Sequence, residues 1–242
     1  MERSSDAALV APCVAFVTLG CAKNEADTAR MRVRLAEAGF LIEDDPAEAD
    51  AVVVNTCSFI QSATEESIEA VFDAAGMPNV AAGAPLIVAG CMPARYGEEL
   101  ADELVEARAF VPCSREDDIA AIVADALGVD APGGGAAEVE GSRAALAALP
   151  AAPFAYVKIS DGCDRFCTYC TIPYIRGRYR SFPLDDVRAD VAAQVAAGAR
   201  EIVLIAQDTG RWGADFDEPS SLAALVAALA EEFPQTWFRI MY

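Results

Sequence analysis

The first 128 residues alternate short apolar runs with segments of helical periodicity, and this alternation restricts the fold more than any other feature. The apolar runs are nearly uniform in hydrophobicity, which is typical of strands buried on both faces of a parallel sheet. The segments between them are expected to be helices that cover both faces, so we predict a doubly wound α/β domain. The predicted strands are 14–19, 51–55, 85–89 and 109–111, and the predicted helices are 24–38, 60–75, 96–104 and 116–127.

A cysteine follows each of the first three predicted strands. Cys21, Cys57 and Cys91 are separated by 36 and 34 residues, about one strand–helix unit each. Ligands of such sheets bind outside the carboxyl ends of the strands, so we expect these thiols at one edge. We interpret them as ligands of an iron–sulfur cluster with one open iron, and three unrelated buried cysteines are the alternative. Cys113 follows the fourth strand, either as a spare ligand or as a bystander, and is left out of the predicted site.

A second group of three cysteines lies in a single loop. Cys163, Cys167 and Cys170 form a Cys-x3-Cys-x2-Cys run within SDGCDRFCTYCTIPYIRGRYRS. Three thiolates with this spacing can hold one face of an iron–sulfur cube and leave the fourth iron free for a small molecule. A zinc knuckle is the alternative, but zinc prefers four ligands from Cys or Cys/His pairs. The chain contains no histidine, so we favour the cluster.

The Gly triplet and the Ala and Pro content of residues 129–152 indicate a linker between two domains. We therefore predict a first domain over residues 1–128 and a second over residues 153–242. The second domain begins with a strand and then the cysteine loop, and it reads as the start of a β/α barrel. With about three strands, such a barrel is incomplete. Its predicted strands are 154–160, 201–207 and 237–242, and its predicted helices cover 184–195 and 221–233.

Composition sets broad limits on location and partners. The 242 residues are 54% hydrophobic, enough for a substantial core, but no apolar run reaches the roughly 18 residues of a membrane span. We expect a cytoplasmic protein, in which eight cysteines indicate metal or redox chemistry rather than disulfides. The net charge of −20 lies mostly in the first 150 residues. It predicts no direct binding of nucleic acid and favours basic partners, although solubility alone also explains it.

Taken together, the two groups of cysteines resemble those of the methylthiotransferase family of radical S-adenosylmethionine (SAM) enzymes. The resembling segments cover most of residues 14–212. They read TLGCAKNEADT, VVNTCSFIQSATEESIEAVFDAA, VAGCMPARYGEELADEL, SDGCDRFCTYCTIPYIRGRYRS and GAREIVLIAQDT. Within these segments, CAKN, ESIEAVFDAA and RYGEEL are similar to the branch of the family that modifies a ribosomal protein.

The resemblance implies two 4Fe–4S clusters and SAM as cofactors. One SAM would methylate a sulfur on the auxiliary cluster, and a second would be split to a deoxyadenosyl radical that removes hydrogen from carbon. The implied target is the β-carbon of an aspartate on the twelfth protein of the small ribosomal subunit. The implied ligands are Cys163, Cys167 and Cys170 for the SAM-cleaving cluster, and Cys21, Cys57 and Cys91 for the auxiliary cluster. Because the cofactors carry the hard step, no catalytic side chain is predicted.

Five further residues are candidates for binding SAM or the clusters. Tyr169 is expected either to pack against the cluster and adenine or to anchor the loop. Arg176 is expected to offset cluster charge or to contact the SAM carboxylate or the substrate, unless it is a solvated charge. Gln207 and Asp208, at the carboxyl end of a strand, are predicted to bind polar groups of SAM. Asn24, beside the first cysteine, is expected to cap a helix or to hydrogen-bond cluster sulfur.

The resemblance is incomplete and leaves alternatives. Members of the family end in a further domain of TRAM type, which, like the second half of the barrel, is not found in this sequence. We therefore expect a truncated chain that binds clusters but lacks full turnover. The implied partners are a ribosomal protein and an electron donor such as flavodoxin or ferredoxin. The alternatives are a tRNA adenosine methylthiotransferase and a non-catalytic iron–sulfur or zinc module.

Overall fold

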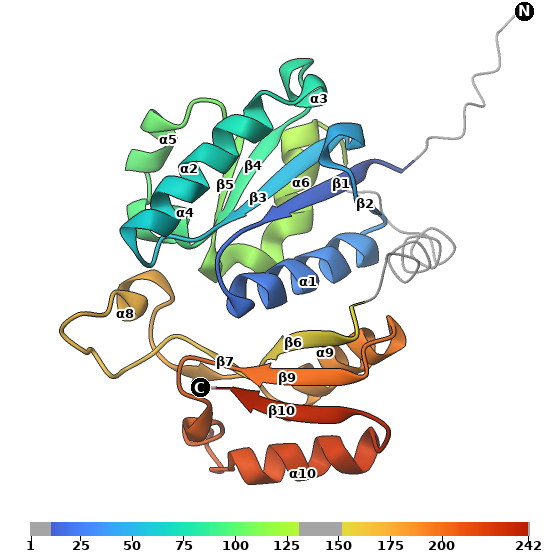
Figure 1. Ribbon diagram of the computed structural model, residues 1–242, viewed down its shortest axis with the longest axis vertical. Helices are drawn as coiled ribbons and strands as arrows, with labels where there is room; N and C mark the ends of the chain where they lie inside the picture. Colours follow the sequence, from blue (N-terminus) through green and yellow to red (C-terminus); the bar gives the residue numbers. More distant parts are fainter. Residues whose placement is uncertain (1–10, 131–151, 242) are drawn as a thin grey trace, which may run out of the picture.

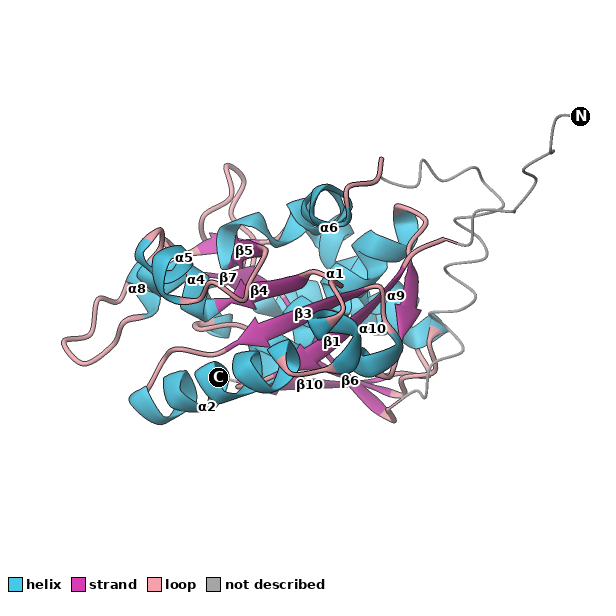
Figure 2. Ribbon diagram, turned by 90° about the horizontal axis from the view of Figure 1, so that it is seen from above, coloured by secondary structure: helices cyan, strands magenta, loops and turns pink. Residues whose placement is uncertain are grey.

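Two parallel β-sheets with packed helices, and a two-stranded antiparallel sheet of residues 160–161 and 180–181, form the part of the chain that the computed structural model describes, residues 11–130 and 152–241 (Figures 1 and 2). We call residues 11–128 the first unit and residues 153–241 the second unit. The strands of the first unit are β1 (Cys13–Thr18), β2 (Leu41–Glu43), β3 (Ala51–Thr56), β4 (Leu86–Gly90) and β5 (Ala109–Pro112). Its helices are α1 (Ala22–Glu37), α2 (Gln61–Ala75), α3 (Pro78–Ala81), α4 (Cys91–Tyr96), α5 (Glu99–Glu103) and α6 (Ile119–Leu127), with 3-10 turns η1 (Pro46–Glu48) and η2 (Cys113–Asp118).

The first sheet is parallel throughout, in the order β2-β1-β3-β4-β5. This is the flavodoxin-like strand order, whose switch point lies between β1 and β3. The predicted doubly wound fold is confirmed. The sheet has one strand more than the sequence pattern predicted, because β2 is only three residues long and pairs only at the edge, through Cys13 opposite Leu41 and its neighbours.

Helices cover both faces of the first sheet (Figure 2). On one face, Met31 of α1 and Val123 of α6 pack on Val53 of β3. On the other face, Val71 of α2 packs on Val54 of the same strand. Neighbouring valines of β3 thus point to opposite cores, as the pleat of a strand requires. Because both faces are buried, the strand has no polar face, which explains the uniformly apolar run in the sequence.

The second unit contains a smaller parallel sheet in the order β10-β9-β6. Two helices cover one face, where Val187, Val191 and Leu225 pack on Leu204. This arrangement confirms the predicted β/α pattern. The elements are β6 (Phe154–Lys158), β7 (Ser160–Asp161), α8 (Ile172–Ile175), β8 (Arg180–Ser181), α9 (Leu184–Ala196), β9 (Glu201–Ile205), the 3-10 turn η3 (Thr209–Arg211), α10 (Leu222–Glu232) and β10 (Trp237–Met241).

Helix α1 belongs to the packing of both units. Figure 1 shows it between the first sheet and β6. Ala22 and Ala26, in its first turns, pack against Tyr156, Val203 and Ile205 on the free face of the second sheet. Small side chains at these positions allow the helix to lie close to the strands. The first residues of α1, next to Cys21, are therefore held by both sheets.

The predicted linker, residues 129–152, falls almost wholly outside the described residues, so the domain boundaries stay a prediction. The longest helix in the described ranges, α1, has 16 residues. Within residues 11–130 and 152–241, no helix combines the length and apolar character needed to cross a bilayer.

Two glycines shape the strand ends that precede cysteines. Gly20 has φ of +94°, and a Cβ there would lie 2.5 Å from Cβ of Cys57. Gly90 also has φ of +94°, and its Cβ would lie 2.6 Å from the Thr56 carbonyl oxygen. In both cases the end of strand β3 lies too close for a side chain. The glycines thus allow the loops after β1 and β4 to converge on the end of β3.

Replacing Gly90 by alanine is expected to lower the free energy of unfolding by about 3 kcal/mol or more, because backbone strain adds to the collision with Thr56. Gly83→Ala is the matched control: φ is +118° but nothing lies within 4 Å of the added Cβ. It is expected to cost only about 1–2 kcal/mol of strain. Urea unfolding followed by circular dichroism measures both, and equal losses would contradict this account of Gly90.

Candidate metal centres

The first three predicted ligands meet at one edge of the first sheet. Cys21 ends the loop after β1 and precedes α1, Cys57 follows β3, and Cys91 begins α4 after β4. Cys57 and Cys91 are buried, whereas Cys21 is exposed. The structure therefore brings together the three cysteines that the sequence placed at this edge, with one of them at the rim. We call them the first triad.

Asn24 lies between the thiols of the first triad and is completely buried. Its Oδ1 atom accepts hydrogen bonds from Cys21 Sγ at 3.7 Å and Cys91 Sγ at 4.0 Å. Its Nδ2 atom donates to the Thr56 carbonyl oxygen at 2.8 Å, directly before Cys57. Asn24 thus contacts the ends of all three strand–cysteine segments. It has a hydrogen-bonding role at the triad, in addition to its place in the first turn of α1.

The backbone of Cys57 is fixed from the opposite side by α2. Its N–H group donates to Ser67 Oγ at 3.0 Å, and the Ser67 hydroxyl donates to the Cys57 carbonyl at 2.8 Å. Ser67 is itself fully buried. This reciprocal pair fixes the backbone at Cys57, in the loop after β3.

Cys113 lies against Cys91, at the start of the 3-10 turn that follows β5. The hydrogen bond from the Cys113 thiol, helped by Arg176 and opposed by burial, lowers the pKa of Cys91 to about 6. The same hydrogen bond, together with burial, raises the pKa of Cys113 well above its ordinary value. Cys91 is therefore the more readily ionised thiol of the pair, and a thiolate is the form that binds iron.

The other three cysteines, which we call the second triad, lie in the loop between β7 and α8. Cys163 is buried, Cys170 is half-buried and Cys167 is exposed. The Cys163 N–H group donates to the carbonyl oxygen of Gly177 at 3.1 Å, and the Cys170 N–H group donates to that of Cys167 at 3.0 Å. Phe166 has φ of +47°, in the left-handed region. The loop is thus a tight, folded turn that presents its thiols from one short segment.

Unpartnered polar atoms lie near the second triad, at the carboxyl ends of β6 and β9. Neither the Nε2 nor the Oε1 atom of Gln207 has a hydrogen-bond partner, although both atoms are buried. The hydroxyl groups of Ser160 and Thr171 are likewise buried and unpartnered. Buried polar groups are normally satisfied, so these atoms fit a site for a polar ligand. Gln207, which the sequence analysis predicted to bind polar groups of SAM, is one of these residues.

Asp208 and Tyr169 have different surroundings. Asp208 Oδ2 accepts from Arg165 Nε at 2.9 Å and Nη2 at 2.8 Å, so its carboxylate holds the cysteine loop to the end of β9. Tyr169 is 85% exposed and is available to contact a ligand or partner at the loop surface. The structure therefore gives Asp208 an anchoring contact that the sequence did not indicate.

A buried cluster of charged side chains lies between the two units and joins them. Lys158 Nζ contacts Asp27, lies 2.8 Å from Asp161 Oδ2 and lies 3.7 Å from Glu116 Oε2. Arg176 Nη2 lies 2.9 Å from Asp27 Oδ2, and its Nη1 lies 3.3 Å from Asp161 Oδ2. None of these side chains is more than 14% exposed. We call these five residues the interface charge cluster.

The charges of this cluster shift the pKa values of its members. Burial alone would lower the pKa of Lys158, but three carboxylates raise it above its ordinary value. Burial alone would raise the pKa of Asp161, but Lys158 and Arg176 bring it to about 2. Burial and the neighbouring Asp27 raise the pKa of Glu116 well above 4.5. The two cations and Asp161 are thus held charged, while Glu116 favours its protonated form.

The residues of each triad fit an iron–sulfur cube. Within residues 11–130 and 152–241, no three His, Cys, Asp or Glu side chains converge on a single metal ion. A cube of four irons is larger than one ion and takes thiolates that are further apart. In the first triad two of the thiols, those of Cys21 and Cys91, contact Asn24, whose side chain can also hydrogen-bond ligand sulfur. In the second, the folded loop lies beside unpartnered buried polar atoms.

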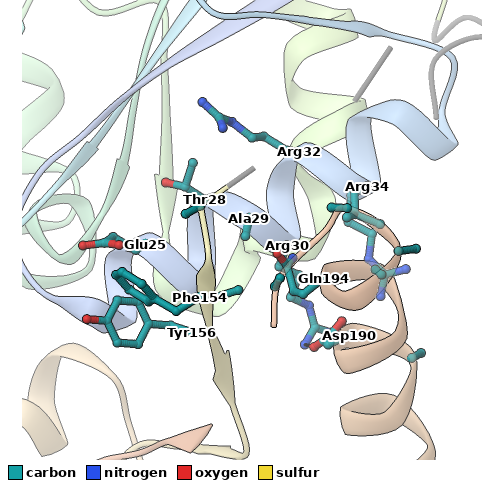
Figure 3. Close-up of a pocket in the computed structure, with 18 of the residues that line it drawn as sticks. Glu25, Thr28, Ala29, Arg30, Arg32, Arg34, Phe154, Tyr156, Asp190 and Gln194 are labelled. Atoms are coloured by element: carbon teal, nitrogen blue, oxygen red, sulfur yellow. Dashed lines mark ion pairs between the residues drawn. The ribbon is translucent and has the colours of Figure 1, made fainter. Parts of the chain in front are cut away.

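A separate cavity of about 790 Å³ lies between α1, the start of β6 and α9 (Figure 3). Figure 3 shows Phe154 and Tyr156 side by side at one end, near Glu25. At the other end Arg30 faces Asp190, with Nη1 and Oδ2 3.9 Å apart. The described residues that line this cavity include none of the six predicted cluster ligands. It is therefore distinct from the metal centres.

Sequence reasoning did not identify the charged residues of the interface, apart from Arg176. Asp27 lies on the buried face of α1, three residues after Asn24 and four before Met31. Lys158 ends an otherwise apolar strand. A charged residue at a position that the periodicity assigns to the core is a signal for a buried pair. The partners themselves come from different units, so the sequence pattern alone does not pair them.

Comparison with known proteins supports the motif assignment. A family model described as "Uncharacterized protein family UPF0004" matches residues 13–112. The chain is 41% identical to the ribosomal protein uS12 methylthiotransferase RimO of Desulfosudis oleivorans, over 95% of this chain and 53% of that protein. It is also 41% identical to the RimO of Geobacter sulfurreducens, over 95% of this chain and 52% of that protein. The chain spans about half the length of the curated relatives it matches.

A solved structure with a similar fold is that of OxsB, a cobalamin-dependent SAM radical enzyme. The match has a TM-score of 0.55 at 11% identity and covers 94% of this chain and 38% of that one. Fold, cysteine pattern and sequence similarity thus agree. The sequence similarity bears out the resemblance that the motifs predicted, to methylthiotransferases of the radical SAM type. The proteins that carry this similarity are ribosomal protein methylthiotransferases, to which the chain is 41% identical over about half of their length.

Glu116→Gln is expected to gain stability relative to the wild-type chain as the pH rises. Because the pKa of Glu116 is raised on folding, its stabilising contribution is fully present below the ordinary value of 4.5 and is lost as the pH rises through the folded pKa. Glutamine does not titrate. Urea unfolding of both chains between about pH 5 and pH 8 measures the difference, and a pH-independent difference would contradict this assignment.

Proposed function

We propose that this chain carries the cluster-binding and SAM-binding parts of an enzyme that methylthiolates ribosomal protein uS12, at the β-carbon of an aspartate. The observation that carries the proposal is that six cysteines form two triads, one at the edge of each unit. Buried residues join these units directly behind the triads. Similarity to uS12 methylthiotransferases over nearly the whole chain supports the substrate.

In this proposal each triad holds one 4Fe–4S cluster, and SAM binds at the second. When bound, the clusters and SAM supply the radical and the sulfur atom that the protein's own side chains cannot provide. The chain's residues bind and orient these groups. Cys57 is fixed by Ser67, and Asn24 hydrogen-bonds at the first triad. The folded loop supplies the second set of thiolates.

The SAM site is assigned to the carboxyl ends of β6 and β9. Gln207 and Ser160 present buried polar atoms without protein partners, which suit the polar groups of SAM. Asp208, through Arg165, keeps the cysteine loop against the end of β9 and contributes indirectly. Tyr169, exposed beside the third cysteine of the loop, is proposed to pack against the bound ligand.

The proposed partners follow from charge and from the relatives. The net charge of −20 favours a basic substrate such as a ribosomal protein over an RNA backbone. A reduced flavodoxin or ferredoxin is the proposed electron donor. The proposed location is the cytoplasm, where thiols are kept reduced and available for iron.

Anaerobic reconstitution with iron and sulfide tests the two-triad assignment. The wild-type chain is expected to bind about eight irons, and Cys57→Ser and Cys163→Ser about four each, because each removes one cluster. Cys13→Ser is the matched control, since Cys13 lies at the amino end of β1, away from both triads, and should leave the count unchanged. A count of one metal per triad, or zinc in place of iron, would overturn the proposal.

Cleavage of SAM separates the roles of the two triads. Under a strong reductant, the wild-type chain and Cys57→Ser are expected to form 5′-deoxyadenosine, whereas Cys163→Ser is not.

For the whole protein, mass spectrometry of uS12 and tRNA from a strain that lacks the protein distinguishes the two candidate substrates. Loss of the modification from tRNA, with uS12 unchanged, would contradict the proposed substrate.

A further inference from the structure

A guanidinium from the second unit reaches into the first triad. Arg176 follows α8, in the segment that carries the second triad, yet its Nη2 atom lies 3.6 Å from Cys91 Sγ. The same atom donates to Asn24 Oδ1 at 3.3 Å and to Asp27 Oδ2 at 2.9 Å. The side chain is only 1% exposed. Arg176 is thus a buried cation in contact with a cysteine of the other unit.

The position of Arg176 is strongly determined by its neighbours. Asp27 and Asp161 hold its two terminal nitrogens, and Lys158 lies on the far side of both carboxylates. Such a planar, multiply bonded guanidinium is held in one orientation. It cannot rotate toward solvent without leaving buried carboxylates unpaired. The contact with Cys91 is therefore a fixed feature of the docked units.

We propose that Arg176 is a positioning residue of the first triad, which carries a positive charge from the second unit to the auxiliary iron–sulfur cluster. This inference rests on the proposed function, because it requires a cluster at the first triad. It assigns Arg176 to the cluster of the opposite unit, whereas its place in the sequence suggested the cluster of its own loop. The first site is then completed only when the two units dock.

Asp161 extends this contact to the second triad. Its Oδ2 atom accepts from Arg176 Nη1 at 3.3 Å, and its Oδ1 atom accepts from the N–H group of Gly162 at 2.9 Å. Gly162 is followed directly by Cys163. A short path of hydrogen bonds thus runs from Cys91 through Arg176 and Asp161 to Gly162, the residue directly before the first cysteine of the second triad. The two proposed sites share one charged pair.

The positive charge of Arg176 is expected to change the reduction potential of the auxiliary cluster. A reduced cluster carries one more negative charge than an oxidised one, and nearby charge and hydrogen bonds to its sulfurs set its potential. Arg176 should therefore stabilise the reduced auxiliary cluster, and Asp161 should oppose it. Removing the cation lowers the potential, while removing the anion raises it. General damage to the interface would not produce opposite shifts.

The experiment measures the midpoint potential of the auxiliary cluster alone. In a chain carrying Cys163→Ala, Cys167→Ala and Cys170→Ala, the electron paramagnetic resonance signal arises only from the first triad. Arg176→Gln is expected to shift the potential to a more negative value, and Asp161→Asn to a more positive one. Arg178→Gln is the matched control, because Arg178 lies in the same segment but is 79% exposed. It should leave the potential unchanged.

The outcomes separate this inference from the proposed function. If the parent variant assembles no cluster, the proposed function fails first, and this inference fails with it. If the cluster assembles but neither Arg176→Gln nor Asp161→Asn moves the potential, or both move it in the same direction, only this inference is overturned. If Arg176→Gln does not fold, Asp161→Asn decides, because asparagine keeps the shape and the acceptor: a rise supports the inference and an unchanged potential overturns it.

Discussion

The parallel register of the first sheet is the constraint on which the rest of the molecule depends. Because all five strands run in one direction, the chain leaves each of them at the same edge, and the residue after each strand arrives there whatever its distance in sequence. Cys21, Cys57 and Cys91 reach one place for this reason. Gly20 and Gly90 allow the close approach, since a side chain at either would collide with the end of β3.

The second constraint is the burial of charge between the units. Lys158, Asp27 and Arg176 are all nearly inaccessible, and removing one partner would leave another charge unpaired inside the protein. Such pairs add little net stability but tolerate few alternative arrangements. Together with the packing of Ala26 on the second sheet, they fix how the units meet. The same contacts connect the structural interface to the proposed chemistry.

The sequence predicted the features that depend on local pattern and missed those that depend on docking. Strand ends and the cysteines after them follow from hydrophobic runs, so the edge position of the first triad was predictable. Strand β2 was not, because three residues, of which only the middle one is buried, are too few to give a pattern. The contact between Arg176 and Cys91 joins residues 85 positions apart in different units. It depends on α1 lying between two sheets, which no periodicity within either unit encodes.

The most direct test of the account is the magnetic interaction between the two clusters in the reconstituted wild-type chain. The triads share the Arg176–Asp161 pair, so the clusters should lie close enough for their electron spins to interact when both are reduced. The account predicts that pulsed electron paramagnetic resonance detects faster relaxation and broadened lines, both lost when either triad is removed. A wild-type spectrum equal to the sum of the two single-cluster spectra would contradict it.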